Sequence, residues 1–436
     1  MSMAEQLDVY LYGVNVAALE LLGPQQYRLA YRTEWLDDPN RMPVSASLPL
    51  TPKPATGAVL AAYLDNLLPD NADVRDRWAV DAGLATPEPF HLLRVYGADV
   101  AGAIQFAEPG TDPNANGERT PVNDQGIASR IRAIREDDTS WQDPDRDTGY
   151  FSLGGAQGKF SLGNTGDGWY EPTGNHPTTH ILKPRVRQQV DGELIEYIAM
   201  TAATVAGINT APVAIQEFDG ERALVVDRFD RIVNDDGTII RVHQEDMAQA
   251  LGVPRLRKYE SKGGPGYRDI IRLLDTYVPE ERRAVSMLTF TQALVFSWMV
   301  LNTDAHAKNY SVFIRPDGLD LTPLYDVSSF IPYAGHIDDD RRATGIAFRK
   351  SKLSMRIAAD YEAGEQSWFE WLAVARETGL DRAALSRWGG LLAERLPELI
   401  NAIAGTLPGH LQTDVVARFV DRIEIRSRQV SQAIAK

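Results

Sequence analysis

The chain has 436 residues, of which 44% are hydrophobic and 24% charged, and its formal net charge is −15. These values are typical of a globular protein with two or three domains, and the acidic balance argues against a broadly basic nucleic-acid-binding protein. Cysteine is absent, which excludes disulfides, thiolate catalysis and cysteine-ligated zinc. The N-terminus lacks a signal-peptide pattern, and no apolar run approaches the roughly 18 residues of a membrane span. We therefore expect a cytoplasmic protein without membrane contact.

The first hundred residues mix strand and helix patterns. Leu7–Gly13 and Tyr27–Trp35 alternate apolar and polar residues like half-buried strands. Ala61–Val80 has apolar residues at helical spacing and is broken by Pro69. Segments rich in Pro, Gly, Asn and Asp follow. We expect an α/β N-terminal domain over residues 1–110 and a linker with loops over residues 111–149.

Strand patterns return between residues 150 and 240, interrupted by one helical segment, Gly192–Ile208. Two turn signals, Asp219-Gly220 and Asp236-Gly237, join some of these strands. Beyond residue 240 the pattern is mainly helical, with expected helices at Glu281–Leu301, Ser367–Thr378, Arg382–Ile403 and Val415–Ala433. The predicted fold class is α+β: after the N-terminal domain come a strand-rich lobe over residues 150–240 and a helical lobe over residues 241–436.

A cluster of polar residues follows an apolar helix at "LNTDAHAKNYSV", Leu301–Val312. Asp304 and Asn309 have the spacing of the aspartate and asparagine in the kinase catalytic loop, where one orients a hydroxyl and the other binds Mg²⁺. Asp326 is a second carboxylate that could bind metal. The pair alone is also compatible with an ordinary polar turn at a helix end.

The stretch "FSLGGAQGKFSL", Phe151–Leu162, is a Gly-rich loop between two strand patterns. It is not a Walker A loop, because Leu153 stands where the first glycine would be and Phe160 follows the lysine. Backbone N–H groups of such a loop can bind phosphates, although a plain flexible turn explains the glycines equally well.

Three further features follow the Gly-rich loop in the order found in kinases. Lys183 ends a strand and can reach phosphates, and the next helix offers Glu193 and Glu196 as partners for it. Leu224–Arg231 then has the character of a hinge between lobes. Each feature is weak alone, but the ordered set is far less expected by chance.

Two other patterns favour structural explanations. His176 and His180 have the spacing of zinc ligands, but Pro177 opposes a helix there, so we expect no zinc site. Basic residues also cluster near residue 350, and any nucleic-acid contact there should depend on a partner because the chain is acidic. These basic residues are Arg349, Lys350, Lys352 and Arg356.

The sequence resembles the HipA family of serine/threonine kinase toxins. The segments that carry the resemblance are "YLDNLLPDN", "SLGGAQGK", "HILKP", "VVDRFDR", "HQEDMAQALG", "TDAHAKNYS" and "PLYDVSS". The resemblance implies a kinase-like fold, ATP and Mg²⁺ as cofactors, and a protein substrate phosphorylated on serine or threonine. It also implies a HipB-like helix-turn-helix antitoxin as partner, with operator DNA bound only through the antitoxin complex.

Carried over residue by residue, the resemblance makes Asp304 the catalytic base and Asn309 and Asp326 the metal ligands, with Glu196 supporting Lys183. It makes Ser152 a site of inactivating autophosphorylation. Gly158 stands where the family has glutamate, which predicts a more flexible loop. The residues expected to bind the nucleotide are Gly154, Gly155, Ala156, Gln157, Gly158, Lys159, Lys183, Asp227, Arg228, Phe229, His306, Ala307, Lys308, Asn309 and Asp326.

Two alternatives remain open at this point. Small-molecule kinases also use an aspartate and asparagine at this spacing, although the "LDNLLPD" segment speaks against that class. The other alternative is a catalytically silent co-repressor module that acts with a DNA-binding antitoxin. The retention of Lys183, Asp304, Asn309 and Asp326 weighs against it.

Overall fold

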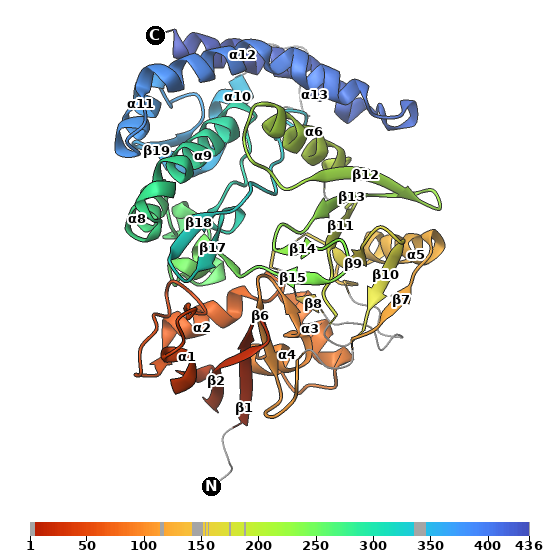
Figure 1. Ribbon diagram of the computed structural model, residues 1–436. Coiled ribbons are helices and arrows are strands. Elements are labelled where there is room, and N and C mark those ends of the chain that lie inside the picture. Colours follow the sequence, from red (N-terminus) through yellow and green to blue (C-terminus); the bar gives the residue numbers. More distant parts are fainter. Residues whose placement is uncertain are drawn as a thin grey trace. The chain divides into compact units, whose positions relative to one another are not determined.

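The computed structural model describes residues 5–113, 117–141, 151–152, 154–155, 157–173, 176–186, 189–334 and 346–435. Helices and strands both occur throughout this part of the chain (Figure 1), which confirms the expected α+β class. The chain divides into two compact units. Unit 1 comprises Met1–Val186, Gln216–Lys258 and Ser311–Gly318; unit 2 comprises Arg187–Ile215, Tyr259–Tyr310 and Leu319–Lys436.

Unit 1 begins with a five-stranded antiparallel sheet of order β4-β3-β2-β1-β6. Its strand β1 is largely buried, and the carboxylate of Asp8 is neutralised there by Arg32 at 2.6 Å. The break expected at Pro69 is present, because one helix ends at Asn66 and the next begins at Ala72. The elements are β1 Glu5–Leu11, β2 Val14–Gly23, β3 Gln26–Tyr31, α1 Thr33–Leu36, β4 Ala55–Thr56, α2 Ala58–Asn66, α3 Ala72–Asp81, α4 Pro89–Tyr96 and β6 Ile104–Ala107.

The second sheet of unit 1 has the order β12-β13-β11-β9-β10-β7, and helix α5 packs on it. Ile127, Ile131 and Ile134 of α5 form a core with apolar residues of β9, β11 and β13. Asp219 and Gly220, both at positive φ, make the expected turn between β12 and β13. The elements are β7 Arg119–Pro121, α5 Asp124–Glu136, β9 Phe160–Asn164, β10 Trp169–Pro172, β11 His180–Pro184, β12 Val213–Phe218 and β13 Glu221–Asp227.

Shorter elements complete unit 1. A parallel pair joins β5 to β8, and β16 pairs antiparallel with β17. Asp246 caps α7 through a reciprocal capping box with Gln249. The elements are β5 Asp99–Val100, β8 Phe151–Ser152, β14 Arg231–Val233, β15 Ile239–Arg241, β16 Gln244–Asp246, α7 Met247–Ala250, η1 Arg255–Arg257 and β17 Ser311–Arg315.

Unit 2 is mainly helical, and its two longest helices, α12 and α13, lie side by side (Figure 1). The four helices expected beyond residue 240 are all present within two residues of the predicted ends. Among the described residues, none of the helices has the length and apolar character that a membrane span requires. The elements are α6 Gly192–Val205, η2 Glu260–Lys262, α8 Tyr267–Tyr277, α9 Glu280–Met299, η3 Ala307–Asn309, β18 Gly318–Leu321, α10 Ile346–Lys350, β19 Lys352–Ile357, β20 Asp360–Glu362, α11 Trp368–Glu377, α12 Arg382–Gly405, η4 Gly409–Leu411 and α13 Asp414–Ile434.

Candidate active site

The loop that carries Asp304 and Asn309 starts where the buried helix α9 ends in unit 2. Leu301 adopts a φ of +51°, which turns the chain out of the helix. The Ser329 hydroxyl donates to the Val300 carbonyl at 2.7 Å, and the Phe330 N–H donates to the Leu301 carbonyl at 3.0 Å. The first two carbonyls after the helix are therefore satisfied, which holds the start of the loop in place.

Asp304 projects from this loop with 63% of its side chain exposed. Its Oδ1 accepts a hydrogen bond from the Tyr259 hydroxyl at 2.6 Å. The His306 ring lies against both groups, with Nε2 4.0 Å from Asp304 Oδ2 and its ring edge-on to Tyr259 at 5.0 Å. The exposed carboxylate can thus accept a hydrogen bond from a hydroxyl group.

The other predicted residues of this loop are buried, and Asn309 faces Asp326. The Asn309 Nδ2 lies 3.1 Å from Asp326 Oδ2, and the Tyr325 hydroxyl donates to the Lys308 carbonyl at 2.8 Å. The described residues hold no cluster of three His, Cys, Asp or Glu side chains for a metal. An amide and a carboxylate oxygen fit a Mg²⁺ ion whose remaining ligands are phosphates and water. The relative exposures are 5% for His306, 0% for Ala307, 7% for Lys308 and 4% for Asn309.

The described part of the Gly-rich loop folds back on itself in unit 1. The Lys159 ammonium donates to the Gly154 carbonyl and lies 5.2 Å from the centre of the Trp141 ring. Gly155 has a φ of +102°, a backbone conformation that side-chain-bearing residues rarely adopt, which explains the glycine there. Gln157 is partly buried, and Ala156 lies outside the described residues.

Gly158 packs closely against α5. A Cβ on Gly158 would lie 2.7 Å from Ile134 Cγ2, a distance that real side chains do not adopt. The residue is buried, and its φ is not in the left-handed region. The structure therefore explains Gly158 by close packing of the loop base on a helix, whereas the sequence alone suggested added flexibility.

Ser152 is fully buried next to the N-terminal "LDNLLPDN" segment in unit 1. Its Oγ donates to the Leu67 carbonyl at 2.8 Å, and β8 around it pairs with β5. The Asp70 N–H donates to the Gly155 carbonyl at 2.8 Å, and the Asp70 carboxylate accepts from Lys258 Nζ at 2.9 Å. This N-terminal segment therefore holds the loop at Ser152 and at Gly155.

Lys183 and Glu196 belong to different units, and each is buried there. Lys183 is 8% exposed on β11 of unit 1, opposite Leu224 of β13. Glu196 is 4% exposed on α6 of unit 2. Lysine and glutamate side chains are rarely buried unless they are paired. The burial of Lys183 and of Glu196 is therefore unusual for surface charges and is compatible with a functional role.

The three residues expected at the hinge have three different environments in unit 1. Asp227 is exposed and lies 3.3 Å from His180 Nε2, while the Phe229 ring is edge-on to Phe313 at 5.8 Å. Arg228 is buried and directs its guanidinium to Asp99 at 3.1 Å. Its side chain therefore has a structural role in the protein interior.

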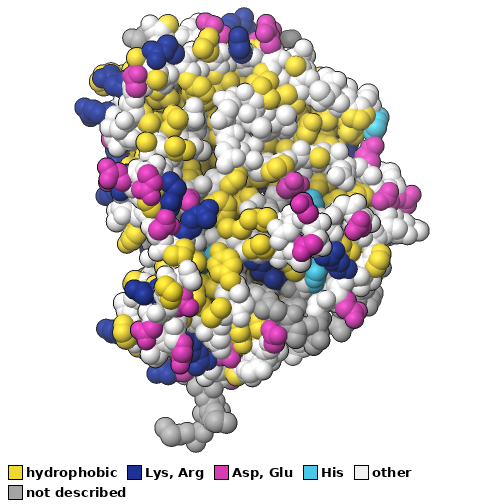
Figure 2. All heavy atoms as spheres, in the orientation of Figure 1, with side chains coloured by type: hydrophobic (Ala, Val, Ile, Leu, Met, Phe, Trp, Pro, Cys, Tyr) yellow, Lys and Arg dark blue, Asp and Glu magenta, His cyan; other side chains and the backbone are white. Residues whose placement is uncertain are grey.

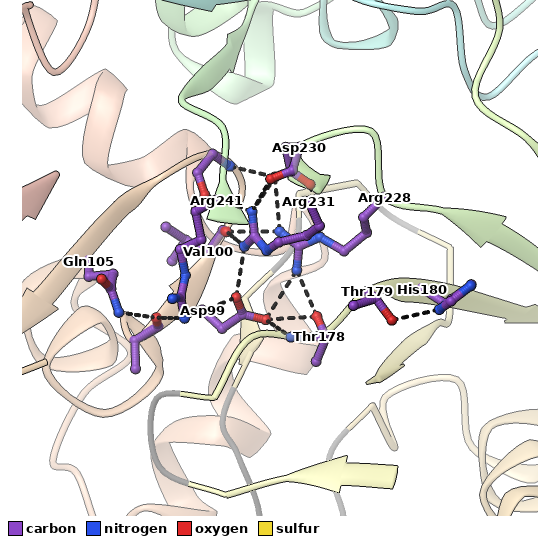
Figure 3. Close-up of polar contacts among 12 residues, drawn as sticks. Asp99, Val100, Gln105, Thr178, Thr179, His180, Arg228, Asp230, Arg231 and Arg241 are labelled. Atoms are coloured by element: carbon purple, nitrogen blue, oxygen red, sulfur yellow. Dashed lines mark hydrogen bonds and ion pairs between the residues drawn. The ribbon is translucent and has the colours of Figure 1, made fainter. Parts of the chain in front are cut away.

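Arg228 belongs to a buried ion cluster that joins β5 to the segment after β13 (Figure 3). We define the cluster as Asp99, Arg228, Asp230, Arg231 and Arg241. Burial alone would raise the pKa of Asp99, but the three guanidinium groups outweigh burial and hold it far below its usual value. Burial lowers the pKa of Arg241 to about 10. Asp99 also accepts from Thr178, just before the strand that carries Lys183.

The "HQEDMAQ" segment is part of the interior of unit 1. His243 Nε2 lies 3.1 Å from the Val44 carbonyl, and burial lowers the pKa of His243 to about 4. Glu245 Oε1 accepts from the Ala46 N–H at 2.7 Å, and burial raises the pKa of Glu245 to about 8. Both residues bind backbone groups of the N-terminal part of the chain, so this segment is structural.

Tyr259 is the residue at Asp304 that the sequence did not indicate. It precedes Asp304 by 45 positions, and no spacing rule relates a tyrosine in a short turn to a distant carboxylate.

Comparison with known proteins identifies the family. A model of the HipA N-terminal domain matches residues 7–107, and a model of the HipA-like C-terminal domain matches residues 151–401. Y4mE of Sinorhizobium fredii, whose name marks it as a candidate kinase, is 31% identical over 93% of both chains. The serine/threonine-protein kinase toxin HipA of Shewanella oneidensis is 28% identical over 91% of this chain and 92% of its own length.

A solved structure agrees with these matches. HipA of Shewanella oneidensis, in a complex with HipB and operator DNA, superimposes with a TM-score of 0.79 at 25% identity, covering 99% of both chains. The fold similarity thus extends along the whole chain, including both regions matched by the family models. This chain belongs to the HipA family.

Proposed function

We propose that this HipA-family kinase transfers the γ-phosphoryl group of ATP to a serine or threonine hydroxyl of a cellular protein. The observation that carries the proposal is Asp304: an exposed carboxylate on the loop after α9, already accepting a hydroxyl hydrogen bond at 2.6 Å. A kinase base needs this arrangement, because it orients the attacking hydroxyl and takes its proton as the new bond to phosphorus forms.

The other loop residues support the transfer. Asn309 and Asp326 would hold Mg²⁺ through their side-chain oxygens, and their side chains are adjacent, with Asn309 Nδ2 donating to Asp326 Oδ2 at 3.1 Å. The metal supplies positive charge that offsets the charge developing on the transferred group. Lys183 and the Gly-rich loop of unit 1, including Gly154, Gly155 and Lys159, would bind phosphate oxygens, and Phe229 would contact the adenine.

Ser152 is proposed as the site of inactivating autophosphorylation. Its hydroxyl is inaccessible while it donates to the Leu67 carbonyl, so the β8 segment must leave its place beside β5 before transfer. A phosphate adds about two negative charges, and these cannot return to a site lined by a carbonyl oxygen. The modified loop would therefore stay undocked and lose its hold on ATP.

The proposed partner is a HipB-like helix-turn-helix antitoxin, with operator DNA bound through the joint complex. The Shewanella oneidensis relative has a solved structure in such a complex. Acidic and basic side chains are interspersed on the face drawn in Figure 2, and the chain carries a net charge of −15. Because a chain with a net negative charge is repelled by DNA phosphates, any DNA contact should depend on a basic partner.

Labelled ATP with Mg²⁺, an extract of cellular protein and the purified full chain test the proposal. Label should reach serine or threonine residues of an extract protein, and Asp304→Asn should reduce transfer by about 10²-fold or more. Transfer to sugars or aminoglycosides but not to protein would instead identify a small-molecule kinase. Antitoxin-dependent DNA binding without any ATP turnover would identify a silent co-repressor.

A further inference from the structure

The Tyr259 hydroxyl makes the bond to the proposed catalytic base that an acceptor hydroxyl would make. It donates to Asp304 Oδ1 at 2.6 Å, within unit 2. A serine or threonine acceptor must also donate its proton toward this carboxylate. A hydroxyl that approaches Oδ1 along the same direction must displace the Tyr259 hydroxyl, since two oxygen atoms cannot occupy one hydrogen-bonding position.

We propose that Tyr259 is a gate that occupies the acceptor position of Asp304 in the resting enzyme and is displaced by the acceptor hydroxyl. This inference rests on the proposed function, because it assigns the acceptor position of the same site. It adds a residue that the kinase loop pattern does not contain. It also places the acceptor hydroxyl at Asp304 Oδ1.

The surroundings of Tyr259 allow its side chain to leave while its backbone stays. Its carbonyl accepts from the N–H groups of Lys262 and Gly264, both at 3.0 Å. The next residue, Glu260, is tied to Arg356 at 2.9 Å. Opening therefore needs only rotation of the tyrosine side chain, which is partly exposed and faces an exposed carboxylate.

The ring and the hydroxyl of Tyr259 can be separated by substitution. The ring packs edge-on against His306 at 5.0 Å, and Lys262 Nζ lies 5.3 Å from its centre. Tyr259→Phe keeps both ring contacts and deletes only the group that bonds to Asp304. A change in activity then reports the hydroxyl itself.

If Tyr259 is a gate, Tyr259→Phe should change the rate of ATP hydrolysis in the opposite direction from the change expected if Tyr259 merely positions Asp304. Without the phenol, the position on Asp304 Oδ1 that the phenol fills becomes available to water, and ATP hydrolysis in the absence of an acceptor should rise. In that reaction the water oxygen bonds to the γ-phosphorus, its proton passes to Asp304, and ADP leaves as the β–γ bridge breaks. A positioning tyrosine would instead leave a less well-oriented base and slower hydrolysis.

The experiment measures phosphate release from Mg²⁺-ATP by the full chain and phosphorylation of a degenerate peptide mixture with one fixed central serine. We expect Tyr259→Phe to raise release, and to lower the half-saturating peptide concentration, by about threefold to tenfold, because the competing closed state is removed. The matched control is Tyr10→Phe, which deletes the phenol that donates to the Thr111 carbonyl at 3.0 Å, and it should behave like the parent.

Unchanged or slower phosphate release by Tyr259→Phe would overturn the gate. So would a fall in the maximal rate with an unaltered half-saturating concentration, since that result belongs to a positioning role. The double variant with Asp304→Asn should release phosphate no faster than Asp304→Asn alone. Full activity of Asp304→Asn would overturn the role of Asp304 as the base, and a parent chain that phosphorylates no peptide or protein would overturn the proposed function itself, so these failures are distinguishable from failure of the gate.

Discussion

Asn309 Nδ2 lies 3.1 Å from the Oδ2 of Asp326, and Asp326 holds this position with a φ of +59°. Among residues other than glycine, asparagine and aspartate tolerate the left-handed region best. Such a conformation persists when neighbouring bonds fix it, and the Tyr325 hydroxyl does so by bonding to the Lys308 carbonyl. The carboxylate is thus aimed at the catalytic loop by its own backbone.

Asp326→Asn should abolish the contribution of Mg²⁺ to nucleotide binding. Asparagine tolerates the left-handed backbone, so the fold is kept while the anionic ligand is lost, whereas alanine would add strain. We expect ATP affinity in the presence of Mg²⁺ to fall by about tenfold or more and metal-free affinity to change little. Titration calorimetry with and without Mg²⁺ measures both.

The control for this substitution is Asp360→Asn, an exposed aspartate at the start of β20. It removes the same charge from unit 2 without touching the loop. Equal Mg²⁺ dependence in Asp326→Asn and Asp360→Asn would remove Asp326 from the set of metal ligands.

Asp99→Asn should destabilise unit 1 strongly. Asp99 bonds to Arg228 at 3.1 Å and to Arg231 at 2.7 Å, and all three are buried. Its loss leaves two buried guanidinium groups and the partly buried one of Arg241 with one carboxylate, Asp230, which costs roughly 3–5 kcal/mol. Differential scanning calorimetry should record a clear fall in the unfolding midpoint.

The exposed pair of Glu20 and Arg28, 2.7 Å apart on β2 and β3, provides the comparison. Glu20→Gln should leave the midpoint close to that of the parent, because water and salt screen an exposed pair. Similar midpoints for Asp99→Asn and Glu20→Gln would mean that the buried cluster contributes little.

The sequence predicts the parts of the site that lie on one continuous segment. Asp304 and Asn309 are five residues apart, and the apolar pattern of the helix before them is long and regular. Local spacing and hydrophobic period therefore suffice to place them on a loop after a helix. The glycine content and the strand pattern of the sequence likewise suffice to single out the Gly-rich loop and Lys183.

Long-range contacts are what the sequence does not predict. Arg228 was expected to bind the nucleotide from the hinge, and the sequence did not indicate that its guanidinium pairs with Asp99, 129 positions away. Tyr259 meets Asp304 across 45 positions, and Gly158 is selected by the nearby Ile134 of α5. Each of these depends on how separate elements pack, which no local period encodes.

Glu245→Gln should flatten the pH dependence of stability between pH 5 and 8. Burial raises the folded-state pKa of Glu245 to about 8, above its unfolded value of 4.5. Its contribution is therefore fully present below pH 4.5 and is lost as the pH rises through about 8, because the unfolded state ionises first. Glutamine cannot ionise, so the stability of the variant should not show this decrease as the pH rises from 5 to 8.

The measurement is the unfolding midpoint at several pH values, with Glu20→Gln as the control that keeps the parent's slope. The glutamine amide group replaces Glu245 Oε2, which has no hydrogen-bond partner among the described residues. It should therefore shift the unfolding midpoint by the same amount at every pH. The slope is therefore the test, and equal slopes for Glu245→Gln and the parent would contradict a buried, protonated Glu245.

Ser152→Asp should weaken ATP binding through the Gly-rich loop. In the docked loop the Ser152 hydroxyl is a donor to the Leu67 carbonyl, in a site with no exposure. An aspartate cannot donate at neutral pH, and its charge would face a carbonyl oxygen without solvent. The segment should leave its place beside β5, and the loss of the docked loop should reduce ATP affinity by about tenfold.

Ser152→Ala separates the loss of the hydrogen bond from the effect of charge. Alanine also cannot donate, but it is small and neutral, so the segment can remain buried and ATP affinity should stay within about threefold of the parent. Limited proteolysis near residue 152 should then be faster for Ser152→Asp than for Ser152→Ala, because only the charged variant expels the segment. If the two variants bind ATP equally well and resist proteolysis equally, charge at Ser152 does not control the loop, and phosphorylation there cannot act as the proposed switch.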